Sequence, residues 1–217
     1  MPAKDAEHTV WLIDNLESID GHEIEVVGSP ALIETPAGKA VEFDGEGDAL
    51  FVDVHPLAGL EVFTVEVIFR PYADGLKEQR FFHMQEDGSD DRVLFETRLT
   101  GDNQWFLDTF IRSGEGSYVL FAEDFKHPIG PWYHAAIVMD DEKVRHYVNG
   151  ELELEKEIDF TPHTQGRTSL GVRINKVHWY KGAMSKARFT SGILSPEEFL
   201  KPMITPRGIP QTQTSRR

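Results

Sequence analysis

The sequence predicts an all-β domain, and three observations lead to that prediction. Apolar and polar residues alternate over most of the 217 residues, in runs bounded by Gly, Asp, Asn and Pro, which is the pattern of half-buried strands. One hairpin carries Asn149-Gly150, the dipeptide best suited to the positive φ of a type I′ turn. Helical periodicity is nearly absent, and no repeat with a fixed period is visible.

Four alternating runs lie between residues 62 and 123. The run at residues 62–69 places Phe and Val on one face, and Pro71 ends it because proline lacks the amide that a strand ladder needs. Three further runs follow in the same style, at residues 92–99, 105–112 and 118–123. Each predicts a strand with one apolar and one polar side.

The clearest local signal spans residues 132–157. Residues 132–139 are apolar on both faces, as expected of a central strand covered on both sides. After an acidic turn, residues 144–148 return, and the Asn-Gly turn leads into the alternating residues 151–155. These segments predict a three-stranded antiparallel meander.

One short helix is predicted near the C-terminus. Ser195 provides an N-cap, Pro196 occupies the first helical position and Glu198 stands at N3, which together form a capping box. Residues 204–217 have no period and little apolar content, so we expect an extended or mobile tail after a domain of residues 1–203. An arm that packs on a neighbouring subunit is the alternative for this tail.

Composition and charge exclude several partners. The chain has 22 Lys and Arg against 37 Asp and Glu, a formal net charge of −15, whereas nucleic acids and anionic membrane surfaces require a cationic footprint. A polyanionic ligand would need a local cationic pocket that overrides this field.

Cysteine is absent, which excludes disulfides and thiolate metal sites. No apolar run follows the start, so we expect a cytoplasmic protein as written, or an exported one if the chain was trimmed. The oligomeric state is not indicated.

Three segments, in order, resemble laminin-G-like domains of the concanavalin A-like lectin/glucanase superfamily. The first is the Ala-Val-Glu-Phe-Asp-Gly motif at residues 40–45, which continues through residues 50–52 and 63–66. The second is Gly-Pro-Trp-Tyr-His-Ala-Ala at residues 130–136, with the Tyr-Val-Asn-Gly turn. The third runs from residue 171 to the Leu-Ser-Pro-Glu-Glu motif that ends at residue 198.

This resemblance implies a two-sheet antiparallel jelly-roll sandwich with a concave face and paired N- and C-terminal strands. It says little about activity, since members bind glycans or proteins, act on polysaccharides or serve as structural modules. Many members hold a structural calcium near the Asp-Gly turn. Here the acidic pair of the last strand is replaced by Met184-Ser185-Lys186, so we expect no cofactor. Asp44 and Asp48 remain weak calcium candidates, because Asp-Gly steps are turn chemistry first.

Polar residues gather on one side of the middle strands. Glu96 and Arg98 share the polar side of one strand, and Asp108 lies on the polar side of the next. If these strands are neighbours, one sheet face collects charged and imidazole groups in place of apolar residues. We therefore expect the concave face to bind a sugar or sugar-derived ligand through eight residues: Arg80, His83, Gln85, Glu96, Arg98, Asp108, His146 and Trp179.

Three functions remain open on these residues. A carbohydrate-recognising, lectin-like domain is our first hypothesis, with Trp105 or Trp179 as a stacking platform. In a polysaccharide lyase, His83, Glu96 and Arg98 are the catalytic candidates, because an arginine pairs a substrate carboxylate and a histidine takes the adjacent proton. The third hypothesis is a structural or protein-binding module.

Two further residue sets carry less weight as sites. A retaining glycoside hydrolase needs paired carboxylates facing one cleft, whereas the candidate strand carries Glu96 alone. The glutamates at residues 151, 153 and 155 share a face but predict a solvated edge. His134 lies on the doubly apolar strand, so we expect a buried core histidine.

Overall fold

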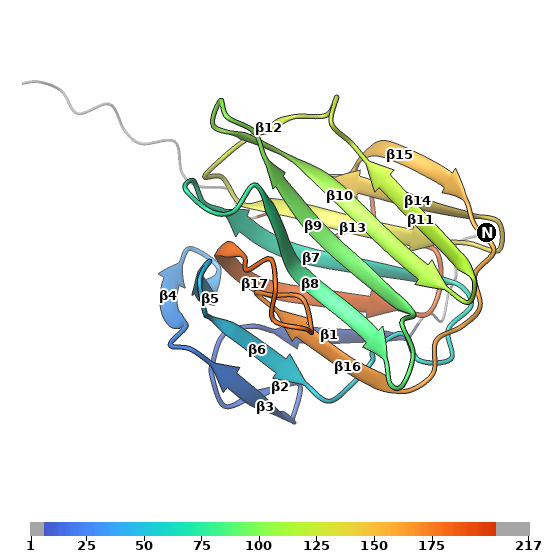
Figure 1. Ribbon diagram of the computed structural model, residues 1–217, viewed down its shortest axis with the longest axis horizontal. Coiled ribbons are helices and arrows are strands. Elements are labelled where there is room, and N and C mark those ends of the chain that lie inside the picture. Colours follow the sequence, from blue (N-terminus) through green and yellow to red (C-terminus); the bar gives the residue numbers. More distant parts are fainter. Residues whose placement is uncertain (1–6, 203–217) are drawn as a thin grey trace, which may run out of the picture.

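The computed structural model describes residues 7–202 and shows two antiparallel sheets packed face to face (Figure 1). We call the nine-stranded sheet, nearest the viewer in Figure 1, the front sheet, and the eight-stranded sheet the back sheet. The front sheet runs in the order β11 (Gly116–Phe121), β10 (Gln104–Ser113), β9 (Arg92–Leu99), β8 (Glu78–Glu86), β16 (Gly166–Leu170), β6 (Ala49–Val52), β3 (His22–Val27) and β2 (Ser18–Ile19), with β12 (His127–Pro128) beside β10.

The back sheet is built from the meander and the terminal strands. Its order is β15 (Glu151–Glu157), β14 (Lys143–Val148), β13 (Tyr133–Met139), β7 (Phe63–Pro71), β17 (Lys181–Thr190), β5 (Gly38–Asp44) and β4 (Ala31–Thr35), with β1 (His8–Leu12) paired to β17. The pairing of the first and last strands, Thr9 opposite Phe189, confirms the expected jelly-roll sandwich. The predicted meander is β13–β14–β15, and Asn149 adopts the positive φ that its turn requires.

The core lies between the two sheets and is rich in aromatic side chains. Phe69 of β7 stacks on Phe81 of β8 with ring centroids 4.3 Å apart, and Trp105 of β10 meets Tyr133 of β13 edge-on at 4.9 Å. Every strand predicted by alternation except β15 turns its apolar side into this core. Such large buried rings supply much of the hydrophobic stabilisation and hold the two sheets in one register.

The predicted C-terminal helix is wrong. Residues 196–198 form a turn, although one of the two contacts of a capping box is present: Glu198 Oε2 accepts the Ser195 backbone N–H at 2.9 Å, and it also accepts the Ser195 hydroxyl at 2.9 Å. The segment leaves the helical path because Phe199 packs on the ring of His134, 5.2 Å away. Tertiary packing therefore overrides the local capping signal.

The predicted tail, residues 204–217, lies outside the described residues. Within residues 7–202, no helix has the length and apolar character needed to cross a membrane.

Candidate functional site

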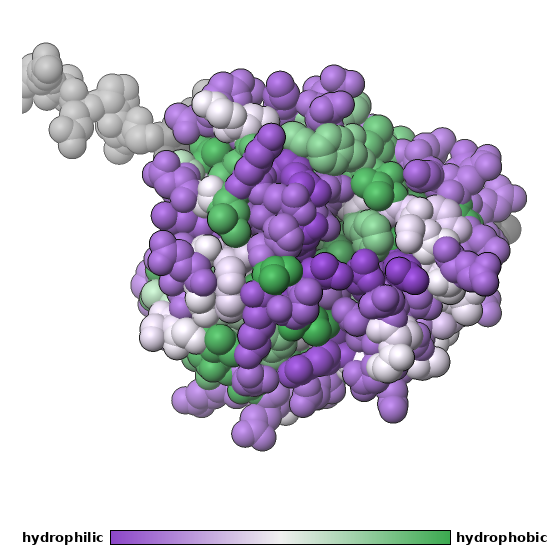
Figure 2. Space-filling model, in the orientation of Figure 1, coloured by the Kyte–Doolittle hydropathy of each residue, from purple (hydrophilic) through white to green (hydrophobic). Residues whose placement is uncertain are grey.

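Five charged side chains lie together on the outer face of the front sheet, across β8, β9 and β10. Cross-strand register places Arg80 opposite Glu96 and Glu96 opposite Asp108. Glu78 lies opposite Arg98 in the same way. We call this set the charged cluster. Figure 2 shows hydrophilic side chains, in purple, gathered over these middle strands with apolar ones, in green, around them.

Arg98 is the centre of the charged cluster. Its Nε and Nη2 atoms lie 2.8 and 2.7 Å from Asp108 Oδ2, and Nη2 is 3.3 Å from Glu96 Oε2. Arg80 Nη2 lies 3.2 Å from the same Glu96 oxygen, and both guanidinium groups also pair with Glu78. Side-chain exposure is 33% for Glu78, 20% for Arg98 and 3% for Glu96, so a ligand approaching from solvent reaches Glu78 and Arg98 before Glu96.

Burial and neighbouring charges allow the charged cluster to bind one proton near neutral pH. Burial raises the pKa of Glu96 to about 7, the nearby charges of Asp108 and Glu78 add to this shift, and Arg80 and Arg98 oppose it. Burial also raises the pKa of Asp108. Three carboxyl groups face two guanidinium groups, so near neutral pH the cluster holds or releases one proton at Glu96 with little cost.

His83 shares this outer face but does not reach solvent. Its ring is fully buried beneath the loop of residues 171–180, and Nδ1 accepts a hydrogen bond of 2.9 Å from the Ile174 backbone N–H. Burial lowers the pKa of His83 well below its ordinary value, and the charge of Arg173 lowers it further. His83 is therefore neutral and out of contact with any ligand on the surface.

The expected placement of His146 is corrected by the structure. His146 points between the two sheets, where Nδ1 lies 3.0 Å from Thr109 Oγ1. Glu153, expected on a solvated edge, is also buried, with Oε2 3.5 Å from His146 Nε2 and Oε1 2.6 Å from His127 Nε2. A register shift in β14 between His146 and Tyr147 turns Glu153 inward.

The remaining predicted site residues lie away from the charged cluster. Gln85 is on the same sheet but donates a 2.9 Å hydrogen bond to the Ser89 carbonyl. Trp179 is half-buried and packs with Phe51 in a small apolar cluster over β6. Trp105 is wholly buried in the core, so it offers no stacking surface to a ligand.

Beside the charged cluster is an open groove of about 850 Å³ that the sequence analysis missed. Phe106 and Phe121 line it, with ring centroids 4.8 Å apart, and the Arg98 guanidinium lies 5.6 Å from the Phe121 ring centre. We call this the aromatic groove. Its other walls come from the end of β9, from the loops of residues 72–77, 100–103 and 122–126, and from the residue after β12: Ala73, Asp74, Gly75, Lys77, Leu99, Thr100, Gly101, Asn103, Glu123, Asp124, Lys126 and Ile129.

A signal for the groove is present in the sequence. Phe106 stands two residues before Asp108, on the polar side of its strand, where an aromatic residue has no place in the core. Glu78 was missed for a different reason. The register shift between Arg80 and Phe82 breaks the alternation along β8, so counting back from His83 places Glu78 on the wrong face.

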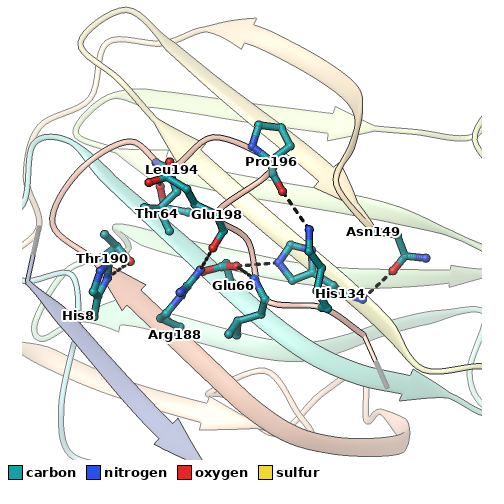
Figure 3. A network of polar contacts seen from close by, with 12 residues as sticks. His8, Thr64, Glu66, His134, Asn149, Arg188, Thr190, Leu194, Pro196 and Glu198 are labelled. Atoms are coloured by element: carbon teal, nitrogen blue, oxygen red, sulfur yellow. Dashed lines mark hydrogen bonds and ion pairs between the residues drawn. The ribbon is translucent and has the colours of Figure 1, made fainter. Parts of the chain in front are cut away.

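The outer face of the back sheet is closed, in contrast to that of the front sheet (Figure 3). Glu66 Oε1 lies 2.9 Å from His134 Nε2 and accepts a 2.7 Å hydrogen bond from the Leu200 backbone N–H, while Oε2 pairs with Arg188. The segment of residues 191–200, which we call the C-terminal strap, lies over these groups. His134 is therefore buried, as the sequence indicates.

Asp44 and Asp48 are occupied by turn contacts. Asp44 Oδ1 accepts three backbone N–H groups, from residues 46, 47 and 48. Asp48 accepts the Ser29 and Asp44 N–H groups through its two oxygens. Calcium takes six to eight oxygen ligands, and residues 7–202 contain no group of three or more His, Asp or Glu side chains able to hold a metal.

Two packed antiparallel sheets with paired terminal strands, one outer face closed and the other open and polar, define a concanavalin A-type jelly roll. A laminin-G family model, described as concanavalin A-like lectin/glucanases superfamily, matches residues 44–199. The chain belongs to this superfamily. No protein with curated annotation matches the sequence.

Several solved structures share the fold. Domain 4 of AbnA, a GH43 extracellular arabinanase from Geobacillus stearothermophilus solved with arabinotriose, is 19% identical over 90% of this chain and 97% of its own, with a TM-score of 0.68. The binding domain of botulinum neurotoxin serotype D is 15% identical with a TM-score of 0.62, and that of neurotoxin DC with SialylT is 10% identical with a TM-score of 0.64. Each covers 88% of this chain, which spans about half of each toxin chain. At these identities the likeness shows the fold alone.

Proposed function

We propose that the protein binds a carbohydrate in the aromatic groove on the outer face of the front sheet. The observation that carries this proposal is the composition of the groove, in which the rings of Phe106 and Phe121 stand among charged and amide side chains from three loops. A sugar ring presents C–H groups to an aromatic face and hydroxyl groups to polar neighbours, so such a mixture suits it. The charged cluster borders the groove through Arg98.

Neighbours of the same fold support this proposal. The arabinanase domain was solved with arabinotriose, and a structure of the type C toxin describes interaction with two ganglioside molecules. We transfer only the ligand class, because function is grafted onto a fold at particular sites.

Phe121→Ala tests the proposal. Phe121 is 43% exposed on the edge strand β11, so its loss removes groove surface without opening the core. We expect arabinotriose, or another neutral oligosaccharide that wild type binds in calorimetry, to bind the variant about tenfold more weakly, in line with roughly 1.4 kcal/mol for a lost aromatic contact.

Phe125→Ala is the matched control, since Phe125 is 41% exposed nearby and does not line the groove. Affinity within about twofold of wild type is expected for the control. Equal losses in both variants, or no binding to wild type across a panel of neutral oligosaccharides, would overturn the proposal and favour a structural or protein-binding module.

We further propose that this binding requires no calcium, because Asp44 Oδ1 and both carboxylate oxygens of Asp48 already accept backbone N–H groups. Chelation with EDTA is expected to leave both affinity and thermal midpoint unchanged. A drop in either that calcium restores would contradict this proposal.

A carbohydrate-active enzyme is the second candidate, favoured by one observation. Glu96 and Asp108 are cross-strand neighbours, and burial raises the pKa of Glu96 to about 7, which suits a general acid. Release of new reducing ends from an oligosaccharide, abolished by Glu96→Gln with binding retained, would establish this candidate. Binding without turnover would reject it.

A further inference from the structure

The outer face of the front sheet divides into two halves with different charge balance. Around Arg80 and Arg98 the charged cluster supplies three carboxyl groups. At the other end of the same strands, Arg92 of β9 lies directly opposite Arg112 of β10. Like charges in this cross-strand position destabilise a sheet unless an anion lies between them.

Nearby carboxylates do not balance these arginines. Asp90 is the carboxylate that reaches them, at 3.9 Å from Arg92 and 3.7 Å from Arg112, and it is 68% exposed on a turn. Asp91 accepts a 2.9 Å hydrogen bond from the Gly114 backbone N–H. Glu86 accepts hydrogen bonds from Ser89 and Thr164. These two acidic side chains are therefore committed to loop contacts.

Arg173 adds a third positive charge from the loop of residues 171–180. Burial lowers the pKa of Arg92, and the charges of Arg173 and Arg112 lower it further, so both of these guanidinium groups lie within electrostatic reach of Arg92. Within residues 7–202, Arg173 has no carboxylate within 4 Å. We call Arg92, Arg112 and Arg173 the arginine group.

Packing orients the arginine group toward a ligand. Arg92 lies over the Phe110 ring, 4.6 Å from its centre, and its Nη1 donates to the Asp90 carbonyl at 2.6 Å. The Nε atoms of Arg92 and Arg112 are buried and have no hydrogen-bond partner in the described part of the chain. The Arg112 side chain is 39% exposed, so an oxyanion from solvent can reach it.

We infer that the arginine group is a subsite for the carboxylate or sulfate group of an acidic sugar. This inference rests on the proposed carbohydrate-binding function and names its ligand class. At about 3.4 Å per residue, Arg112 lies about 20 Å along β10 from Phe106. An acidic oligosaccharide along β9 and β10 occupies the aromatic groove at one end and places its anion on the guanidinium forks at the other.

Calorimetry of wild type and Arg112→Gln tests this subsite, with sodium glucuronate and sodium sulfate as the anionic ligands and uncharged glucose as the control ligand. We expect glucuronate and sulfate to bind wild type and to bind the variant about tenfold more weakly, as for the loss of one charge-assisted hydrogen bond. The ratio of the two wild-type dissociation constants, for glucuronate and for sulfate, tells whether the subsite prefers carboxylate or sulfate. Asp90→Asn removes the competing carboxylate and is expected to strengthen both anions several-fold.

Arg167→Gln is the matched control, because it removes the same charge from the same face, where Glu25 and Asp53 balance Arg167 at 3.4 and 3.1 Å. We expect Arg167→Gln to change the affinity for either anion by less than about twofold. Equal losses in the two variants, or no anion binding by wild type and Asp90→Asn, would overturn the subsite.

The neutral oligosaccharide separates this inference from the proposed function. Its affinity is expected to depend on Phe121 and not on Arg112. Neutral binding without anion binding would remove the subsite and leave the groove, whereas Arg112-dependent anion binding without any neutral sugar would remove the groove and leave the subsite.

Discussion

Glu66 and Glu96 are buried glutamates beneath opposite outer faces of the sandwich, and each lies beside arginine. Burial alone would raise the pKa of Glu66, but hydrogen bonds from His134 and Arg188 outweigh it and hold the pKa below its ordinary value. Burial raises the pKa of Glu96 to about 7. The same side chain in a similar sheet position is therefore ionised near neutral pH at Glu66 but lies between its two protonation states at Glu96.

The number and identity of the neighbours explain this difference. Glu66 receives a histidine, an arginine and a backbone N–H, and the C-terminal strap closes over it (Figure 3). Glu96 has two arginine contacts of 3.2 and 3.3 Å, shared with the acidic Glu78 and Asp108. A buried carboxylate surrounded by donors anchors structure, whereas one that shares its donors with other acids stays able to change protonation.

Removal of the Glu66 carboxylate, which anchors the C-terminal strap, should have the largest effect on stability. Glu66→Ala leaves Arg188 and His134 without their carboxylate and releases the Leu200 N–H. We expect the free energy of unfolding to fall by about 3 to 5 kcal/mol, as for other broken buried pairs. Denaturant unfolding followed by fluorescence measures it.

Glu198→Ala is the control within the C-terminal strap, since Glu198 is exposed and its carboxylate bonds Ser195 alone among the described residues. A loss below about 1 kcal/mol is expected there. If the two alanine variants were equally destabilised, Glu66 would not be the anchor of the strap.

The pH dependence of stability should have opposite signs for the two glutamates. The raised pKa of Glu96 contributes stability that is present below about pH 4.5 and lost as the pH rises through about 7. The lowered pKa of Glu66 contributes stability that is present above about pH 4.5 and lost as the pH falls through its folded value.

The difference in free energy of unfolding between wild type and each glutamine variant, followed with pH, measures the contribution of that glutamate. Glu96→Gln should match wild type near pH 5 and exceed it near pH 8, by on the order of 2 kcal/mol given about 1.4 kcal/mol per pKa unit. Glu66→Gln should fall below wild type at pH 8, and the gap should narrow in acid. If the free energy of unfolding of wild type, Glu96→Gln and Glu66→Gln changed with pH in the same way, the two glutamates would not differ in pKa as described.

Alternation in the sequence predicts much of the fold and part of the site. It places Val93 and Phe95 in the core and Glu96 and Arg98 on the outer face, because side chains of a strand alternate strictly between faces. His146 shares its side with Val144 and Val148. Those two valines are sufficient to place it between the sheets, and the assignment to the ligand face was the error.

Other features depend on contacts that no local pattern contains. His83 is covered by a loop some ninety residues later in the chain, through the Ile174 amide. Glu153 turns inward because of an irregularity in the pairing of β14 with β15. The strap replaces a predicted helix because Phe199 docks on His134. Loop docking and bulges arise from tertiary packing, so periodicity does not predict them.

The smallest expected effect separates the exposed contacts of the C-terminal strap from its anchor. Ser195→Ala removes the hydroxyl that donates to Glu198 Oε2 at 2.9 Å but keeps the backbone N–H that donates to the same oxygen. Because these groups are exposed and no helix follows, we expect a loss of at most about 0.5 kcal/mol, the low end for a cap. The variant should unfold at nearly the wild-type denaturant midpoint. A loss as large as that of Glu66→Ala would mean that the surface turn, rather than the buried carboxylate, holds the strap on the back sheet.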